Sequence, residues 1–447
     1  LAFSLLGASS VALAGVENEA ELRMALANGE TDIEIDADIM IMMGNDPFIY
    51  SGTKALSING NGNTISRDDD GNILELTQGA DLSVENLDFE GPGGYSIQDQ
   101  GEGIGILVNV PETRTGIVKL NLKDVEVSGT AEFGVLVQDC NTDPCGSGSG
   151  GAGNGSKASV SVDFDNVLIS DCGNGAFDGD GARVNERDQG NFLFSSKDTT
   201  FIDNGADGLE LDEGQGGSII SNIKNTHFTD NGAYCDPSLI TLPDPDEAED
   251  LPTAGDGAIT EDELLEFKNN ALDPMCVEIE YELHTGLDTV KEYESGIDLD
   301  DGVDFDEAGK GGITSNMSHS TITGNLDEGV DFDEENEGGT NTNFMYVDAS
   351  NNADDGIKVS EEDAGSVVGN NMMVTADSNG GKAIVYEEAD NGNLSVNVLN
   401  SMTDGNNDGG DEGIEVVQED KGTGKILVRD SIIGEAEPVV TEGVKEL

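Results

Sequence analysis

The sequence is poor in several kinds of residue, and each shortage excludes a class of protein. Its 447 residues include no Trp, only 10 Pro and only 20 Lys or Arg against 92 Asp or Glu, so the formal charge is −72. A chain with so few basic residues has no surface to neutralise phosphates, which excludes a nucleic-acid binder and argues against docking on anionic membranes. No segment after residue 14 reaches the roughly 18 consecutive apolar residues of a transmembrane helix. We therefore expect no nucleic-acid partner and no transmembrane span.

What the sequence does contain is typical of a globular chain with many tight turns. Hydrophobic residues make up 36% of the chain, and its 61 Gly are residues that turns favour. The five Cys are consistent with an oxidising compartment. Pairing Cys140 with Cys145 and Cys235 with Cys276 would leave Cys172 free, although the sequence alone does not decide the connectivity.

The first residues indicate export. Leu1–Ala14 is an uncharged run of apolar and small residues that ends in Ala-Leu-Ala, as the apolar region and cleavage site of a secretory signal do. An apolar start of the mature chain is the alternative. We expect a protein that is secreted or held at the cell surface.

A repeat of 27 residues dominates the rest of the chain. Similar phrases begin 27 residues apart, for example DGVDFDE at Asp301 and EGVDFDE at Glu328. Each unit contains three short runs of alternating apolar and polar residues, separated by Gly, Asn and Asp, which is the pattern of strands with one buried face. The phrases begin at Asp180, Asp207, Asp301, Glu328, Asp355, Lys382 and Glu412.

Three strands per repeat without helical periodicity predict an all-β fold, a single right-handed parallel β-helix solenoid of about ten to twelve coils. Coils stack about 4.8 Å apart, so that equivalent residues form columns. The inward columns are the predicted core. They contain Leu209, Val303, Val330, Ile357, Ile384 and Ile414, and beside these Leu211, Phe305, Phe332, Val359, Tyr386 and Val416.

We divide the chain into five parts. Glu17–Asn28 has apolar residues three and four apart and predicts a short amphipathic helix that covers the first coil. After NGAYCD the repeat is interrupted by an acidic insertion. The parts are 1–15 (signal-like segment), 16–100 (helix cap and first coils), 101–233 (coils), 234–295 (insertion) and 296–447 (C-terminal coils).

The insertion contains half of a calcium-binding motif. The segment GDGAITEDELLEF resembles the end of an EF-hand loop, with Asp256 at its fifth position and Glu263 at its twelfth. The first and third positions fall on Pro252 and Ala254, which have no side-chain oxygen. A calcium site that uses Asp256 and Glu263 and a solvated acidic helix are both open.

The coil pattern, seen early in ALSINGNGNTI, NILELTQGADLSVENLDFEG and GIGILVNV, resembles the pectate-lyase-like superfamily of right-handed β-helix proteins. The resemblance covers nearly the whole chain. It is one of architecture and includes no catalytic motif.

Acidic residues at equivalent outward positions form columns beside the core. Two carboxylates about 5 Å apart repel by roughly 3 kcal/mol at an effective dielectric constant of 20, so such a ladder favours a hard divalent cation. We expect Ca²⁺ on this face; the alternative is a solvated acidic face that salt screens. That the coils before and after the insertion are adjacent is an inference. One column contains Glu210, Asp304 and Asp331, and the next contains Asp212, Asp306 and Asp333.

The resemblance also implies an enzymatic alternative. Polysaccharide lyases of this superfamily use calcium to acidify the C5 proton of a uronate and an Arg or Lys as the base. Lys358 follows Asp331 in its column and Arg183 precedes Glu210, so either could be that base. Equally, each could end a column of carboxylates and neutralise it.

The function that the sequence favours is that of an exported calcium-binding β-helix with a structural, adhesive or self-assembling role. The open ends of a β-helix expose unpaired backbone groups, which favours end-to-end self-association. An acidic polysaccharide, bridged by calcium, is a second candidate partner. The alternative function is a calcium-dependent lyase that acts on an acidic, uronate-containing polysaccharide.

Overall fold

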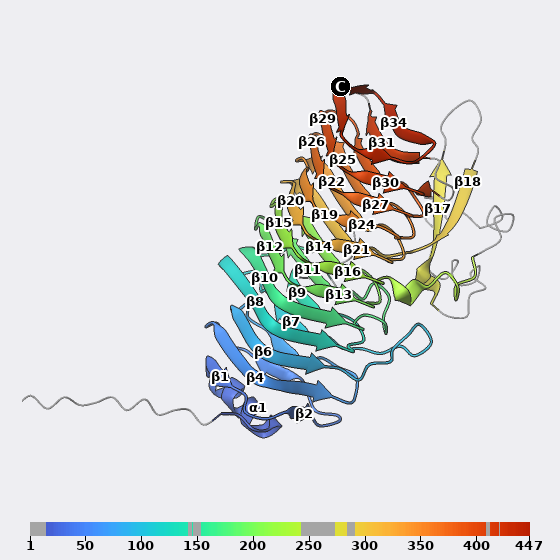
Figure 1. Ribbon diagram of the computed structural model, residues 1–447. Coiled ribbons are helices and arrows are strands. Elements are labelled where there is room, and N and C mark those ends of the chain that lie inside the picture. The colour runs from blue at the N-terminus through green and yellow to red at the C-terminus, as the bar shows by residue number, and fades with distance from the viewer. Residues whose placement is uncertain are drawn as a thin grey trace, which may run out of the picture.

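A computed structural model of the protein describes residues 15–141, 145, 153–242, 273–283, 291–407, 412–419 and 421–447. The described chain forms a stack of coils along one axis (Figure 1). It contains a 12-stranded and a 21-stranded parallel sheet and one antiparallel pair of strands. This arrangement confirms the predicted parallel β-helix. Residues 1–14 of the signal-like segment and the EF-hand-like residues Asp256 and Glu263 lie outside the described residues.

Each coil contributes one strand to the 12-stranded sheet and one or two to the 21-stranded sheet. The 12-stranded sheet contains β3 (Phe48–Tyr50), β5 (Leu74–Leu76), β7 (Ile106–Asn109), β9 (Val135–Asp139), β11 (Ala182–Arg187), β14 (Leu209–Gly214), β19 (Val303–Lys310), β22 (Val330–Glu337), β25 (Ile357–Asp363), β28 (Ile384–Glu388), β31 (Glu412–Gln418) and β34 (Glu437–Glu442). The 21-stranded sheet contains β1 (Asp32–Glu34), β2 (Ile39–Ile41), β4 (Leu56–Arg67), β6 (Leu82–Glu90), β8 (Thr115–Ser128), β10 (Lys157–Ser170), β12 (Phe192–Lys197), β13 (Thr200–Ile202), β15 (Ile219–Lys224), β16 (His227–Thr229), β20 (Ile313–Ser318), β21 (Thr321–Thr323), β23 (Asn341–Met345), β24 (Asp348–Ala349), β26 (Val367–Met372), β27 (Thr375–Asp377), β29 (Leu394–Leu399), β30 (Met402–Asp404), β32 (Gly424–Arg429), β33 (Ile432–Ile433) and β35 (Val444–Glu446).

The predicted inward columns lie in the core. Val303 pairs with Val330 and Phe305 with Phe332 in the parallel register of β19 and β22, and all four are fully buried. The rings of Phe305 and Phe332 stack with their centroids 4.3 Å apart. Equivalent residues of neighbouring coils therefore pack directly on one another, and each coil buries the apolar face of the next.

A ladder of buried Asn side chains joins equivalent turns of neighbouring coils. These turns follow the short strands β13, β16, β21, β24, β27 and β30. Asn325 Nδ2 donates to Asn352 Oδ1 at 2.9 Å, and each Asn of the ladder repeats this bond with the next coil. At the C-terminal end Asn406 donates to Glu435. These bonds satisfy amide groups that would be costly to bury alone. The ladder contains Asn204, Asn231, Asn325, Asn352, Asn379 and Asn406.

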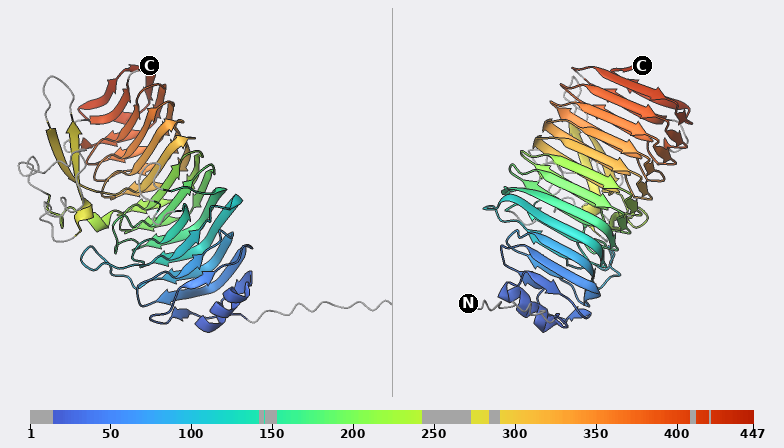
Figure 2. Two further views of the ribbon diagram at one scale, coloured as in Figure 1. Left: turned by 180° about the vertical axis from the view of Figure 1, so that it is seen from behind. Right: turned by 60° about the vertical axis from the view of Figure 1, so that its left-hand side comes forward.

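The predicted N-terminal helix covers the first coil. Helix α1 (Glu19–Asn28) begins after Asn18, whose side chain accepts a hydrogen bond from the Glu21 N–H, and ends at Gly29 in the left-handed conformation. Its face of Leu22, Ala25 and Leu26 is buried. Figure 2 shows α1 at the N-terminal end of the stack. None of the described helices is long and apolar enough to cross a membrane.

The described ends of the insertion form a small unit beside the coils. They contain the 3₁₀ turns η1 (Ala233–Cys235) and η2 (Pro274–Cys276) and the antiparallel strands β17 (Val277–Leu283) and β18 (Lys291–Ile297), which lie alongside the stack (Figure 2). Cys235 bonds to Cys276 and Cys140 to Cys145, while Cys172 is free and buried, as the predicted pairing has it. A second apolar cluster joins this unit to the loop before β7. The cluster contains Ile97, Tyr234, Cys235, Ile240, Cys276 and Val277.

Candidate functional site

The 12-stranded sheet places the predicted acidic residues in register. Strand β14 pairs directly with β19, so Glu210 lies opposite Asp304 although the insertion separates them in the sequence. Asp304 in turn lies opposite Asp331. Arg183 precedes Glu210 in this column and Lys358 follows Asp331. The column therefore has two cations at its ends and three carboxylates between them.

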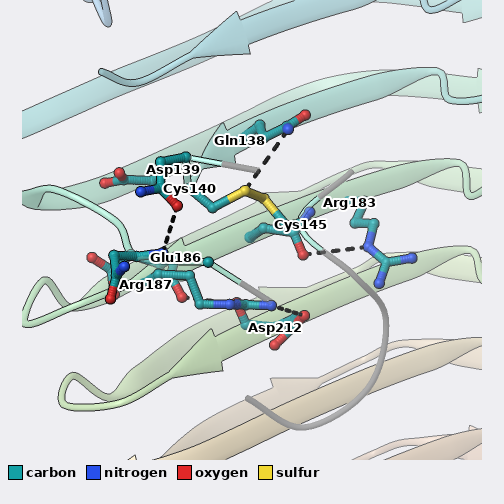
Figure 3. Close-up of a disulfide and its surroundings, with 12 residues drawn as sticks. Gln138, Asp139, Cys140, Cys145, Arg183, Glu186, Arg187 and Asp212 are labelled. Atoms are coloured by element: carbon teal, nitrogen blue, oxygen red, sulfur yellow. Dashed lines mark hydrogen bonds and ion pairs between the residues drawn. A yellow bond between two sulfur atoms is a disulfide. The ribbon is translucent and has the colours of Figure 1, made fainter. Parts of the chain in front are cut away.

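In the second predicted column, two carboxylates already bond to side chains of neighbouring strands. Asp212 accepts a bond of 2.6 Å from Arg187 Nη2, and both residues are fully buried. Figure 3 shows this pair together with the Cys140–Cys145 disulfide. Asp333 accepts a hydrogen bond from the Ser360 hydroxyl. Asp306 is the member of this column that joins carboxylates of the first one.

A third column of acids, outside the predicted site residues, lies in the turns before these strands. The Asp207 N–H donates to Asp180 Oδ1 at 3.0 Å, and the Asp301 N–H donates to Asp207 Oδ1 at 2.5 Å. Glu328 and Asp355 occupy the equivalent turns of the next coils. These residues begin the repeated phrases, so the sequence reveals their 27-residue period. The direction of their side chains depends on the geometry of the turn, and the turn places them beside the acidic residues of the strands.

Residues of these columns, together with Asp178, Asp327 and Asp354 from the same turns, form four groups of carboxylates. In each group oxygen atoms from three residues lie within 4.8 Å of one another. Each group draws on two neighbouring coils. Such sets of hard oxygen atoms are the ligands that Ca²⁺ prefers. The groups are Asp178–Asp180–Glu210, Glu210–Asp304–Asp306, Asp301–Glu328–Asp331 and Asp327–Glu328–Asp354.

Cations of the chain already occupy some of these groups. The Arg183 guanidinium lies 2.9 Å from Asp178, 3.6 Å from Asp180 and 2.6 Å from Glu210, so it fills the first group. The Lys358 ammonium lies 2.7 Å from Asp331 and 3.2 Å from Glu328, and so touches the last two groups. In the group Glu210–Asp304–Asp306, Glu210 Oε1 contacts Arg183 Nη2 at 2.6 Å. In the structure Glu210 Oε2 is buried and has no hydrogen-bond partner among the described residues.

The environment of this group disfavours charge. Burial, and next the charge of Asp306, raises the pKa of Asp304 well above its ordinary value. Burial also raises the pKa of Glu210, although Arg183 opposes the shift. Carboxylates in such a place either bind protons or share a cation that stabilises their charged form.

The two predicted bases are not free. Arg183 is buried and pairs with three carboxylates, and Lys358 pairs with two. Burial lowers the pKa of Lys358, but the charges of Asp331 and Glu328 outweigh it and raise that pKa well above its ordinary value. A base that abstracts a proton needs an accessible lone pair near neutral pH. Both residues instead match the alternative in which a cation ends and neutralises a column.

A buried column of glutamates lies on the other side of the same strands. Glu307 pairs with Glu213 and Glu334 in the strand register, and each is fully buried. The carboxyl groups of neighbouring coils interact with one another, and these interactions raise the pKa values of Glu186, Glu307 and Glu361, so neighbouring groups share protons. Burial, together with the interactions with both neighbours, raises the pKa of Glu307 to about 11. We call this set the glutamate ladder: Glu186, Glu213, Glu307, Glu334, Glu361 and Glu388.

Each member of the glutamate ladder is followed four residues later by a Gly. Glu186 Oε1 accepts a bond of 3.1 Å from the Gly190 N–H. A Cβ atom built on Gly338 would lie 2.0 Å from Glu334 Oε1, so the carboxyl group fills the place of a side chain there. The pattern Glu-x-x-x-Gly at the 27-residue period was the signal that could have revealed the ladder.

Comparisons with known proteins find similarity among solved structures alone. No protein-family model matches the chain, and no curated protein does. Among solved structures, the A-module of the Azotobacter vinelandii mannuronan C-5 epimerase AlgE4 aligns with 96% of this chain and 96% of its own, at 11% identity and a TM-score of 0.41. Tailspike protein 2 of Escherichia coli O157:H7 bacteriophage CAB120 aligns with 86% of this chain at 10% identity and a TM-score of 0.32, and this chain spans 42% of its length. The periplasmic alginate epimerase AlgG covers 96% of the chain at 9% identity and a TM-score of 0.29.

These likenesses are too weak to assign a superfamily or a function. The stacked parallel sheets themselves define the protein as a parallel β-helix. Function has to be argued from the acidic face itself.

Proposed function

We propose that the protein is an exported calcium-binding β-helix with a structural, adhesive or self-assembling role at the cell surface or outside the cell. The observation that carries this proposal is the group Glu210–Asp304–Asp306, whose oxygen atoms lie within 4.8 Å of one another between the cationic ends Arg183 and Lys358. At that separation each pair of carboxylates repels by roughly 3 kcal/mol at an effective dielectric constant of 20. One Ca²⁺ offsets this repulsion and takes Glu210 Oε2 as a ligand.

A structural role accounts for the basic residues better than a lyase role does. Arg183 and Lys358 hold carboxylates in place, as counter-ions in a scaffold do, and their charges are already engaged. The lyase alternative needs one of them as a base, and no contact of the described residues favours that role. The two disulfides agree with export, because such bonds persist in oxidising compartments.

Calcium binding is tested by calorimetric titration with calcium chloride and by thermal unfolding with calcium or a chelator. We expect calcium to raise the melting temperature, since an ion at 100 times its Kd stabilises a folded protein by about 2.7 kcal/mol. Asp304→Asn should remove most of this gain. Asp32→Asn, the same change at an exposed strand residue of the other sheet, should keep it. An equal calcium effect in all three proteins would place the ion elsewhere and refute the site.

The self-assembling role needs a separate measurement. Light scattering and negative-stain microscopy across a calcium titration should show ordered polymers that a chelator dissolves. A protein that binds calcium, gains stability and stays monomeric at high concentration would retain the site but refute assembly. Lys358 and Arg183 would then be the first residues to substitute in an assay for cleavage of acidic polysaccharides.

A further inference from the structure

The group Asp301–Glu328–Asp331 is a second set of calcium-type ligands with a lysine in it. Asp301 and Glu328 come from the turns before β19 and β22, and Asp331 comes from β22 itself. Lys358 on β25 reaches this group from the next coil, 2.7 Å from Asp331 Oδ2 and 3.2 Å from Glu328 Oε1. The ammonium thus lies where a cation would bind.

One ammonium does not satisfy the group. Asp301 is 8% exposed, and its Oδ1 has no hydrogen-bond partner among the described residues. Asp331 Oδ1 is also buried without a partner in the described chain. Three carboxylates facing one positive charge leave an excess of negative charge in a buried place, which is costly unless more positive charge is added.

The two basic residues of this face, Arg183 and Lys358, differ in how easily their charged groups can turn to solvent. The Arg183 side chain is 4% exposed and lies between three carboxylates, two of them almost fully buried. The Lys358 side chain is 31% exposed. A flexible four-carbon stem with a strongly hydrated head can turn to solvent, whereas a buried planar guanidinium with several partners cannot do so cheaply.

We propose that Asp301–Glu328–Asp331 is a second calcium site, and that the ion displaces the Lys358 ammonium towards solvent when it binds. This inference rests on the proposed calcium-binding function, because it assigns a further ion to the same acidic face. The ion replaces one positive charge by two and reaches the oxygen atoms that Lys358 leaves unpaired. The site is weaker than Glu210–Asp304–Asp306, since the ion must compete with the lysine. The Arg183 group takes no ion.

The displacement is measured on the unaltered protein by labelling its amines with an acylating reagent, with and without calcium chloride, and reading each lysine by mass spectrometry. We expect calcium to increase the labelling of Lys358 several-fold. Lys382 is the matched control, because its side chain is 26% exposed and its ammonium pairs with Glu415 at 2.7 Å, away from the group. Labelling of Lys358 that stays unchanged or falls with calcium would overturn the displacement.

Calorimetry on variants separates this inference from the proposed function. The wild type should bind calcium in a tight and a weak class. In Lys358→Met the affinity of the weak class should increase at least tenfold. In Lys358→Arg that affinity should decrease. Adding Asp301→Asn to Lys358→Met should abolish the weak class.

If wild type and Lys358→Met share one class of equal affinity, the second site is wrong and the proposed function stands. If only Lys358→Met binds calcium, the second group is right and the proposed site at Glu210 is wrong; if neither binds, both fail.

Discussion

The glutamate ladder predicts that a glutamine will stabilise the protein at neutral and alkaline pH. Glu307 is fully buried, and its carboxyl group interacts with those of Glu213 on one side and Glu334 on the other. Glu307→Gln keeps the shape of a protonated glutamate, and its amide can donate to both neighbours. The variant removes the need to hold a proton at this position.

The sign follows from proton linkage. In the folded protein the pKa of Glu307 is raised from 4.5 to about 11, so above pH 4.5 the folded state keeps a proton that the unfolded chain releases. The stability that this group contributes is complete below pH 4.5 and is lost as the pH rises towards the folded pKa. The loss is about 1.4 kcal/mol per pH unit for one proton. Between pH 5 and pH 8 the variant should therefore gain up to about 4 kcal/mol on the wild type, an upper limit because neighbouring carboxyls redistribute protons.

The assay is unfolding by urea and by heat from pH 5 to pH 9, in chelator so that metal binding does not contribute. The two proteins should be similar at pH 5, and the variant should be increasingly more stable above it. Glu362→Gln is the control, because Glu362 is an exposed residue of β25 beside the ladder member Glu361; its stability should follow the wild type at every pH. A Glu307→Gln variant that differs from the wild type by a constant amount across this range would refute proton sharing in the ladder.

Two further substitutions test the supports of the coils. Asn352→Ala leaves ladder amides unpaired in the core and should cost about 1–3 kcal/mol in the free energy of unfolding. Asn343→Ala, in a partly exposed row where Asn343 bonds to Asn316 and Asn370, should cost much less. Equal losses in urea unfolding would contradict the buried ladder. Gly338→Ala should lower the melting temperature, because the new Cβ would lie 2.0 Å from Glu334 Oε1. Gly296→Ala is the control and should be neutral, because a Cβ at that position meets no atom within 4 Å. An unchanged melting temperature for Gly338→Ala would refute the close packing of Gly338 against Glu334.

Much of the fold was predictable because a parallel β-helix turns a sequence period into a spatial one. Residues one period apart must stack, so the 27-residue repeat was enough to place Val303 over Val330 and Asp304 over Asp331. Even the strands before and after the insertion could be paired correctly, since their phrases match. The cap by α1 followed from its apolar spacing and from the need to cover the first coil.

The candidate site was predictable only in part. The acidic residues of its strands alternate with core residues, which reveals that their side chains point away from the core. The turn acids, such as Asp301 and Glu328, have no such alternation, and only the course of the turn brings them to the strand acids. Glu307 was overlooked although the alternation points it inward, because a buried carboxyl is acceptable only where a neighbour shares its proton.

The sequence by itself determined the coil, its register and the identity of the stacked columns, because backbone pairing between repeats depends on their period and on which residues are apolar. The tertiary structure decided which carboxylates share a cation, which share protons and which pair with Arg183 or Lys358. These outcomes depend on separations of a few ångströms and on the removal of water. Short separations and the removal of water arise only when turns from different coils come together, so the repeat pattern alone does not contain this information.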